Sequence, residues 1–234
     1  MNNKLYTFLI ASMIGCMNIQ AQNEPWQNAQ INEINREPMS AHFIPFTNES
    51  NALKQRSLPA DIRYNVNPTA ERRISLDGTW KFLYSKNNDA CPSDFHQPQY
   101  NTHKWKNIQV PGSWELQGFD APIYTDTRYP FPPNPPYVPT DYNPVGAYVR
   151  DFTVPNNWNG MDIFIDFEGV ESAYFVWVNG ELAGYAEDSR LSSQFNITKL
   201  LKKGKNRLAV KVFRFSDGSY LEGQDYWKYS GIER

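Results

Sequence analysis

Hydrophobic and polar residues alternate with a period of two through much of the C-terminal two-thirds of the chain, which is typical of half-buried β-strands. Phe175 and Trp177 lead into Asn179-Gly180, a pair favoured in type I′ turns, and therefore predict a strand that enters a tight hairpin. The other predicted strands span residues 76–82, 105–110, 148–154, 162–167 and 208–213.

These strands recur at roughly 10–15-residue spacing, with turns rather than helices between them. Only residues 197–201 suggest a short helical turn. This order predicts an all-β fold, an antiparallel β-sandwich of jelly-roll (galactose-binding-like) type.

Residues 111–146 interrupt the alternation with nine prolines and many aromatic residues. Loops of this length inside a compact domain are uncommon and are usually functional. Proline lowers the entropy that a loop loses on ordering. We therefore expect an ordered loop that takes part in the function.

Residues 22–73 are polar and only weakly periodic. They predict an extended N-terminal arm that lies over a domain formed by residues 74–234. Trp26 and the apolar cluster at residues 43–46 are the expected anchoring points of this arm.

The N-terminus has the pattern of a secretory signal peptide, predicted for residues 1–21. Lys4 precedes an apolar run at residues 5–14, and Ala21-Gln22 is the expected cleavage site. The chain is then exported to a bacterial periplasm or cell surface. A lipoprotein anchor at Cys16 is the less favoured alternative, because the Ala21 site is better placed. No second apolar segment of membrane length follows, so we expect no transmembrane segment.

Composition and length limit the classes of protein to which the chain can belong. The chain has 234 residues, too few for this domain together with a (β/α)₈ barrel of about 250 residues. Aromatic residues make up 15% of the chain, which suits an all-β fold with long loops. The net charge of −2 gives no basic excess that would favour nucleic acid. Without the signal peptide only Cys91 remains, which excludes an internal disulfide.

Several kinds of catalytic site are absent from the sequence. It contains no Gly-x-Ser-x-Gly motif, no zinc-binding Cys-x-x-Cys or His-Glu-x-x-His pattern, and no phosphate-binding glycine loop. Carboxylates are plentiful, but spacing singles out no glycosidase pair, since such acids usually come from different strands. The pair Asp217-Gly218 is typical of a β-turn, and this interpretation is favoured over a catalytic one. It also follows a long buried strand, where a loop would open into a cleft.

Several motifs in order resemble glycoside hydrolase family 2. Leu-Asp-Gly-Thr-Trp at 76–80 resembles the opening of its first domain. The resemblance covers about residues 24–234. Longer motifs resemble the large β-galactosidase branch of the family, and they occupy residues 110–115, 120–125, 129–131, 134–139, 184–190 and 215–222.

This resemblance implies a multidomain retaining enzyme that hydrolyses terminal β-D-galactosides, in which a jelly-roll sugar-binding domain precedes an immunoglobulin-like domain and a catalytic barrel. By the resemblance, Asp217 contacts galactosyl hydroxyls and binds a sodium ion. Asp126 stands where the branch has an Asn that also contacts the sugar. A carboxylate accepts hydrogen bonds but cannot donate one, so one bond of the usual pattern is in question. Neighbouring Arg128 could neutralise the added charge.

The family's two catalytic glutamates sit on the barrel, so we expect no catalytic residue in this chain. Residues 230–234 resemble a last strand cut before it finishes, which predicts an N-terminal piece that is truncated and inactive alone. No cofactor is expected within this chain, although the parent enzyme could use sodium and magnesium.

The expected partners are a β-galactoside or galactose, the remaining domains of the parent enzyme, and further copies in a homo-oligomer of the full-length protein. One alternative is a free-standing carbohydrate-binding module. Another is a fragment of a β-glucuronidase or β-mannosidase of the same family, although the motifs at 134–139 and 216–220 favour a galactoside.

Overall fold

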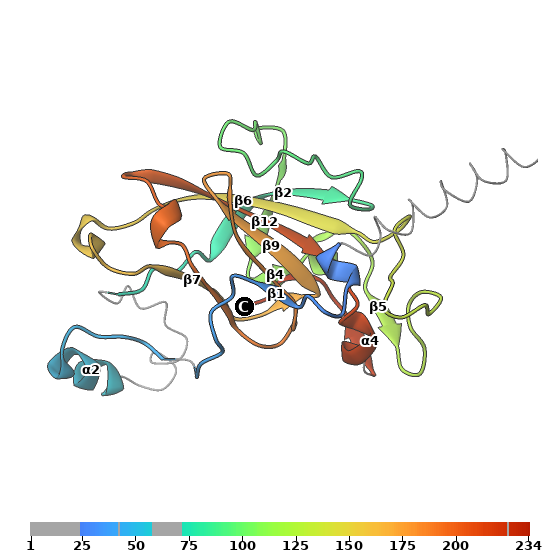
Figure 1. Cartoon of the computed structure of the whole chain (residues 1–234), viewed down its shortest axis with the longest axis horizontal. Coiled ribbons are helices and arrows are strands. Elements are labelled where there is room, and N and C mark those ends of the chain that lie inside the picture. Colours follow the sequence, from blue (N-terminus) through green and yellow to red (C-terminus); the bar gives the residue numbers. More distant parts are fainter. Residues whose placement is uncertain (1–23, 42, 58–71, 224) are drawn as a thin grey trace, which may run out of the picture.

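The computed structural model describes residues 24–41, 43–57, 72–223 and 225–234 (Figure 1). The predicted signal peptide at 1–21, with Cys16, lies outside the described residues, so export and lipid anchoring stay predictions. Among the described helices, none has the length and apolar character needed to cross a membrane.

A seven-stranded antiparallel sheet, in the order β1-β10-β9-β12-β6-β2-β3, forms the centre of the fold. The two longest strands, β6 and β12, pair along their whole lengths, from Lys205 opposite Thr153 to Phe213 opposite Val145. The strands of this sheet are β1 (Glu33–Ile34), β2 (Gly78–Ser85), β3 (Lys106–Val110), β6 (Val145–Thr153), β9 (Ala173–Val178), β10 (Glu181–Ala186) and β12 (Lys205–Phe213).

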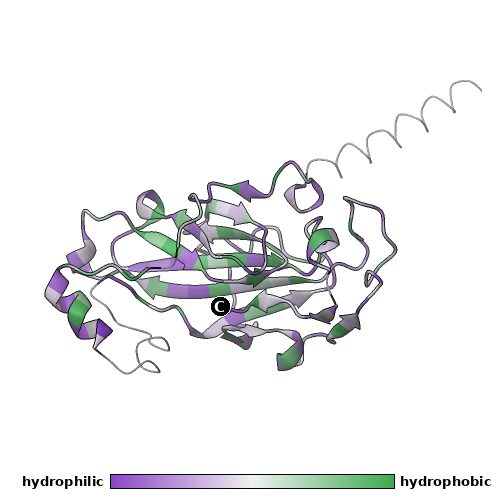
Figure 2. Cartoon of the chain, turned by 90° about the horizontal axis from the view of Figure 1, so that it is seen from below, coloured by the Kyte–Doolittle hydropathy of each residue, from purple (hydrophilic) through white to green (hydrophobic). Residues whose placement is uncertain are grey.

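One face of this sheet packs on a second layer of short strands. Within it β7 (Phe164–Phe167) pairs with β11 (Ser193–Asn196), and β14 (Gly231–Ile232) lies between β4 (Gly112–Ser113) and β8 (Val170–Glu171). Figure 2 shows apolar positions gathered along the central strands. The core between the layers includes Trp80, Phe82, Tyr148, Val176, Val210, Phe167, Phe195 and Ile232. The predicted all-β antiparallel sandwich is confirmed.

The other face of the sheet is covered by loops instead of strands. Phe95 and Trp105 come from residues 86–105, and Phe131 and Val138 come from the proline-rich loop. The central strands are consequently buried on both faces over much of their length, which explains the uninterrupted buried apolar run Leu208-Ala209-Val210 in β12.

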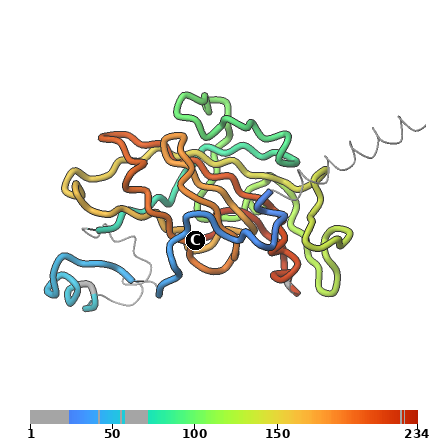
Figure 3. The backbone as a smooth tube through the Cα atoms, in the orientation of Figure 1, coloured from blue at the N-terminus to red at the C-terminus, as the bar shows by residue number. Residues whose placement is uncertain are grey.

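The N-terminal arm adds to this cover. Trp26, in the 3₁₀ turn η1 (Pro25–Gln27), stacks on Phe213 with ring centroids 4.9 Å apart and is buried, as expected of an anchor. In the second expected anchor, the cluster at residues 43–46, Phe43 is 66% exposed and does not anchor the arm, whereas Ile44 and Phe46 are partly buried. Figure 3 shows the blue N-terminal segment reaching the red C-terminal part. A helix, α2 (Glu49–Arg56), follows.

The predicted hairpin joins β9 to β10. Asn179 and Gly180 have φ angles of 54° and 90°, as a type I′ turn requires. The Asn179 side chain donates to the Leu200 carbonyl at 2.8 Å, which holds the turn against the later 3₁₀ turn η4 (Thr198–Leu200). A Cβ at position 180 would lie 2.9 Å from the Gln97 side chain, so only glycine fits.

The remaining elements are short. The helical turn predicted at 197–201 is η4 (Thr198–Leu200), whereas α4 (Ser219–Glu222) was not predicted. Residues 111–146 contain β4, η2 (Glu115–Gln117) and β5 (Ile123–Thr125). The sequence analysis did not predict these elements, because the prolines interrupt the alternation of apolar and polar residues. Two elements complete the set, η3 (Asn156–Trp158) and β13 (Tyr226–Lys228), of which β13 pairs with β5 as a two-stranded ribbon.

Candidate functional site

Asp217 lies just beyond the end of β12, the most central long strand. Its N–H donates to the Trp26 carbonyl at 3.1 Å, and its own carbonyl accepts from the Tyr220 N–H at 3.2 Å. The predicted turn at Asp217-Gly218 is thus the entry to α4. The arm on one side and α4 on the other fix the backbone of Asp217.

The Asp217 carboxylate has spare acceptor capacity. Its Oδ1 atom is buried and accepts no hydrogen bond from an N–H or a hydroxyl group of the described residues, and the acid Glu187 is the side chain that hydrogen-bonds to this carboxyl. Burial raises the pKa of this carboxyl. A half-buried carboxylate oxygen of this kind can accept from a sugar hydroxyl or bind a hard cation.

Glu187 is the acid that lies against Asp217. It follows β10, is only 6% exposed, and accepts a hydrogen bond from the Tyr185 hydroxyl. Burial, followed by the negative charge of Asp217, raises the pKa of Glu187 to about 8. Glu187 is therefore largely protonated at pH 7 and can share its proton with Asp217. The sequence analysis assigned no role to Glu187, because the burial of its side chain arises only in the folded chain.

We expect Glu187→Gln to remove a pH-dependent loss of stability. A folded-state pKa raised above the unfolded value stabilises the fold at low pH, and this contribution is lost as the pH rises through about 8. Glutamine keeps the shape and the acceptor for Tyr185 but cannot ionise. The variant should gain stability relative to the unmodified chain as the pH rises from about 4.5, the ordinary value, to about 8, on the order of 1 kcal/mol for each pH unit, with no further gain above that.

Thermal unfolding monitored by circular dichroism across this pH range measures the effect. The exposed Glu181→Gln is the matched control and should change little. Parallel stability curves for Glu187→Gln and the unmodified chain would contradict the expectation.

Asp126, the second predicted sugar contact, is exposed and directly follows β5. Hydrogen bonds from the N–H and hydroxyl of Thr127 lower the pKa of its carboxyl. Asp126 is consequently an acceptor only. Asp126 and Arg128, both described, form no ion pair. The expected neutralisation of the Asp126 charge by Arg128 is therefore not seen among the described residues.

Tyr220, in α4, connects the regions of Asp217 and Asp126. Its hydroxyl donates to the Tyr137 carbonyl at 2.6 Å and accepts from the Asn134 N–H at 2.9 Å. The Tyr129 hydroxyl in turn donates to the Tyr220 carbonyl at 3.1 Å. The proline-rich loop is thereby fastened to α4. The two predicted residues lie on these joined elements, although their carboxylates share no hydrogen bond in the described part of the chain.

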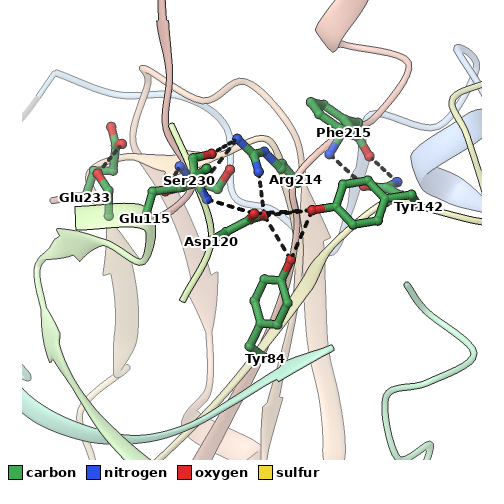
Figure 4. Close-up of polar contacts among 11 residues, drawn as sticks. Tyr84, Glu115, Asp120, Tyr142, Arg214, Phe215, Ser230 and Glu233 are labelled. Carbon is green, nitrogen blue, oxygen red and sulfur yellow. Dashed lines mark hydrogen bonds and ion pairs between the residues drawn. The ribbon is translucent and has the colours of Figure 1, made fainter. Parts of the chain in front are cut away.

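A buried ionic network joins the proline-rich loop to Arg214, three positions before Asp217 (Figure 4). Arg214 follows β12, and its side chain is only 1% exposed. Its guanidinium donates to Asp120 at 2.5 Å and to the Ala121 carbonyl at 2.9 Å, and Glu115 lies 3.7 Å away. All three partners belong to the proline-rich loop.

Further hydrogen bonds close this network. The hydroxyls of Tyr84 and Tyr142 donate to Asp120 at 2.9 and 3.2 Å. Asn143 exchanges two hydrogen bonds with the backbone of Phe215, at 2.8 and 2.9 Å. Both ends of the loop are therefore tied to the segment that carries Asp217. The sequence motifs contain Asp120, but nothing in them predicts its distant partners.

The residues present fit the implied sodium ion only in part. Asp217 offers one oxygen of the right kind, but the described residues contain no group of three His, Cys, Asp or Glu side chains that could hold a metal. A sodium ion at Asp217 would need further oxygens from carbonyls, water or the sugar.

Comparison with known proteins places these features in a family. Residues 74–234 match the family described as "Glycosyl hydrolases family 2, sugar binding domain". The chain belongs to glycosyl hydrolase family 2. The match covers both Asp126 and Asp217 and confirms the resemblance that the motifs indicated.

Two of the curated relatives are proteins named β-galactosidase. The protein from Priestia megaterium is 42% identical over 211 residues, which cover 88% of this chain and 19% of the relative. The protein from Halalkalibacterium halodurans is 38% identical over 217 residues, which cover 91% of this chain and 20% of the relative. The chain therefore spans about a fifth of the length of these relatives.

Solved structures show the same fold. A β-glycosidase from Bacteroides vulgatus is 27% identical with a TM-score of 0.50, over 69% of this chain and 19% of that chain. β-Glucuronidase 2 from Bacteroides uniformis is 24% identical with a TM-score of 0.52, over 68% of this chain and 17% of that chain. The second likeness concerns the fold alone.

Proposed function

We propose that this chain is the sugar-binding part of an exported β-galactosidase that hydrolyses terminal β-D-galactosides with retention. The observation that carries the proposal is the half-buried Asp217 carboxylate at the end of β12, whose buried Oδ1 accepts no hydrogen bond from an N–H or a hydroxyl group of the described residues. It lies within a family 2 sugar-binding domain whose chain is 42% identical to a β-galactosidase.

The chain's own residues bind and orient the sugar. Asp217 accepts hydrogen bonds from galactosyl hydroxyls, and charge-assisted bonds of this kind are about twice as strong as neutral ones. Asp126 accepts a further bond at the edge of the site. The carboxylates that form and hydrolyse the covalent glycosyl-enzyme belong to the remaining domains of the parent enzyme.

Other properties of the parent enzyme complete the proposal. Sodium binds at Asp217 together with the sugar, and magnesium serves elsewhere in the parent. The full-length protein forms a homo-oligomer and works in the periplasm or at the cell surface. Anchoring through Cys16 is the weaker alternative for its location.

Asp126 also bears on the alternative substrates. A glucuronide carries a carboxylate of its own, and the ionised Asp126 would repel it at this site. This favours a neutral sugar over a β-glucuronide. A free-standing carbohydrate-binding module and a β-mannosidase would bind a neutral sugar too, so an experiment has to separate them.

Galactose titration of the full chain, followed residue by residue by NMR, tests the proposal. We expect shifts of the amides around Asp217 at about millimolar galactose, the range of weak single-sugar binding. Mannose and glucuronate should leave these amides unchanged. Chromogenic β-galactoside should not be turned over above the blank. Turnover would place the catalytic pair within this chain, and mannose binding at Asp217 would overturn the galactoside assignment.

A further inference from the structure

A polar recess lies at the opposite end of the sheet from Asp217. It has a volume of about 360 Å³, within the usual range of small-ligand pockets. Arg207 lines the recess, and Phe213 lies near Asp217. These two residues are six positions apart on β12, so the usual rise of a strand separates the recess from the Asp217 end of β12 by about 20 Å. The residues with polar side chains among those that line the recess are Thr79, Lys81, Thr102, Asn107, Arg150, Asp151 and Arg207.

Strand register brings the charged side chains of the recess together. Lys81 pairs with both Asn107 and Val149, and Arg207 pairs with Asp151, so these side chains lie on the loop-covered face of the sheet. That face is identified by Val149, which packs under the loops. The recess is thus built by four neighbouring strands.

The charge of the recess is positive although the chain as a whole carries −2. Lys81, Arg150 and Arg207 line it, and the only acid in the lining, Asp151, is ion-paired with Lys205 at 2.7 Å. Four cations therefore surround one carboxylate. An excess confined to one recess favours an anionic ligand there.

Arg207 has hydrogen-bonding capacity that the described residues do not use. Its Nη1 donates to the Pro98 carbonyl at 3.1 Å, whereas its Nε and Nη2 are buried with no acceptor in the described part of the chain. A buried donor without a partner costs about 1–3 kcal/mol. The guanidinium fork matches the two oxygens of a carboxylate or sulfate, and a small rotation would present these donors to such a group.

The recess lacks the feature that usually holds a neutral sugar. Trp80 borders it, but its ring is 2% exposed and packs into the core between the two layers. No exposed ring face is therefore available from Trp80 for stacking on a sugar. Binding in this recess has to come from charge and hydrogen bonds.

We propose that this recess binds the carboxylate or sulfate group of an acidic saccharide, separately from the Asp217 site. Arg207 and Lys81 hold the anionic group, and Asn107 and Thr79 contact the sugar hydroxyls. The Thr79 hydroxyl accepts from the Gln109 side chain at 2.9 Å, so its own hydrogen remains free to donate. The recess thus gives the domain a second, charge-selective contact with a polysaccharide.

The test is a titration of the full chain with sodium glucuronate, sodium sulfate and galactose, each followed by amide shifts in NMR. We expect glucuronate to shift amides of the recess, with an affinity that falls as salt is added. Galactose should shift only the amides around Asp217. No recess shift with glucuronate would overturn the proposal, and shifts with sulfate alone would overturn its assignment to a saccharide.

Substitutions identify the contacts. Arg207→Gln should weaken glucuronate binding about tenfold or more, as expected when a charged pair is lost. Lys81→Gln, on a partly exposed side chain, should weaken it several-fold without disturbing the fold, which covers the case in which Arg207→Gln does not fold. Lys54→Gln, which removes a charge from exposed α2, is the matched control. Equal binding by all three variants would overturn the proposal.

Discussion

Replacing Asp120 by alanine should lower the free energy of unfolding by about 3–5 kcal/mol, the cost of leaving one charge of a buried pair without its partner. Arg214 would remain buried with its positive charge uncompensated by the carboxylate that now lies 2.5 Å away. The hydroxyls of Tyr84 and Tyr142 would lose their acceptor as well. Urea denaturation of the full chain, monitored by tryptophan fluorescence, measures the difference.

A surface ion pair is the matched control for Asp120. Asp151 pairs with Lys205 at 2.7 Å, but their side chains are 44% and 71% exposed. Asp151→Ala should therefore cost no more than about 1 kcal/mol. Asp120→Ala combined with Arg214→Met and Glu115→Gln should recover much of the loss, because uncharged side chains then replace all three charges of the buried network. A loss for Asp120→Ala as small as that for Asp151→Ala would show that the network contributes little.

Asp217→Asn should weaken galactose binding about tenfold to a hundredfold. Asparagine keeps the shape and one oxygen, but it removes the charge that strengthens hydrogen bonds from the sugar hydroxyls, each worth about 1.5–3 kcal/mol. The backbone contacts of Asp217 with Trp26 and Tyr220 do not involve the side chain, so the fold should survive. Galactose titration followed by NMR or calorimetry gives the dissociation constants.

The exposed Asp162→Asn removes the same charge away from the site and serves as the control. It should bind galactose like the unmodified chain. Unchanged binding in Asp217→Asn would remove Asp217 from the sugar site and would leave the fold and the family assignment intact.

The strands were predictable because their apolar patterns are local: β7 alternates exposed and buried residues, and the apolar runs of β6 and β12 are buried on both faces of the sheet. The hairpin was predictable because Asn179-Gly180 favours positive φ angles that few other pairs adopt. In both cases the signal lies within a few neighbouring residues. Local sequence was therefore sufficient for the elements of the sandwich.

The support of the candidate site depends on partners far apart in the chain. Arg214 and Asp120 are 94 positions apart, and Tyr220 contacts Tyr137 across 83 positions. No local pattern encodes such a pairing. The four-residue helix α4 is too short to give a periodic signal, and the raised pKa of Glu187 follows from burial that only the assembled fold provides.

The hydrogen bond from the Asp217 N–H to the Trp26 carbonyl joins the beginning of the described chain to the proposed sugar site. Docking of the arm and occupation of the site are consequently linked equilibria, and their coupling free energy acts equally in both directions. A sugar that holds Asp217 in place also favours the docked arm, and an arm held by Trp26 on Phe213 lowers the ordering cost that the sugar would otherwise bear. The N-terminal segment thereby becomes a contributor to affinity without touching the ligand.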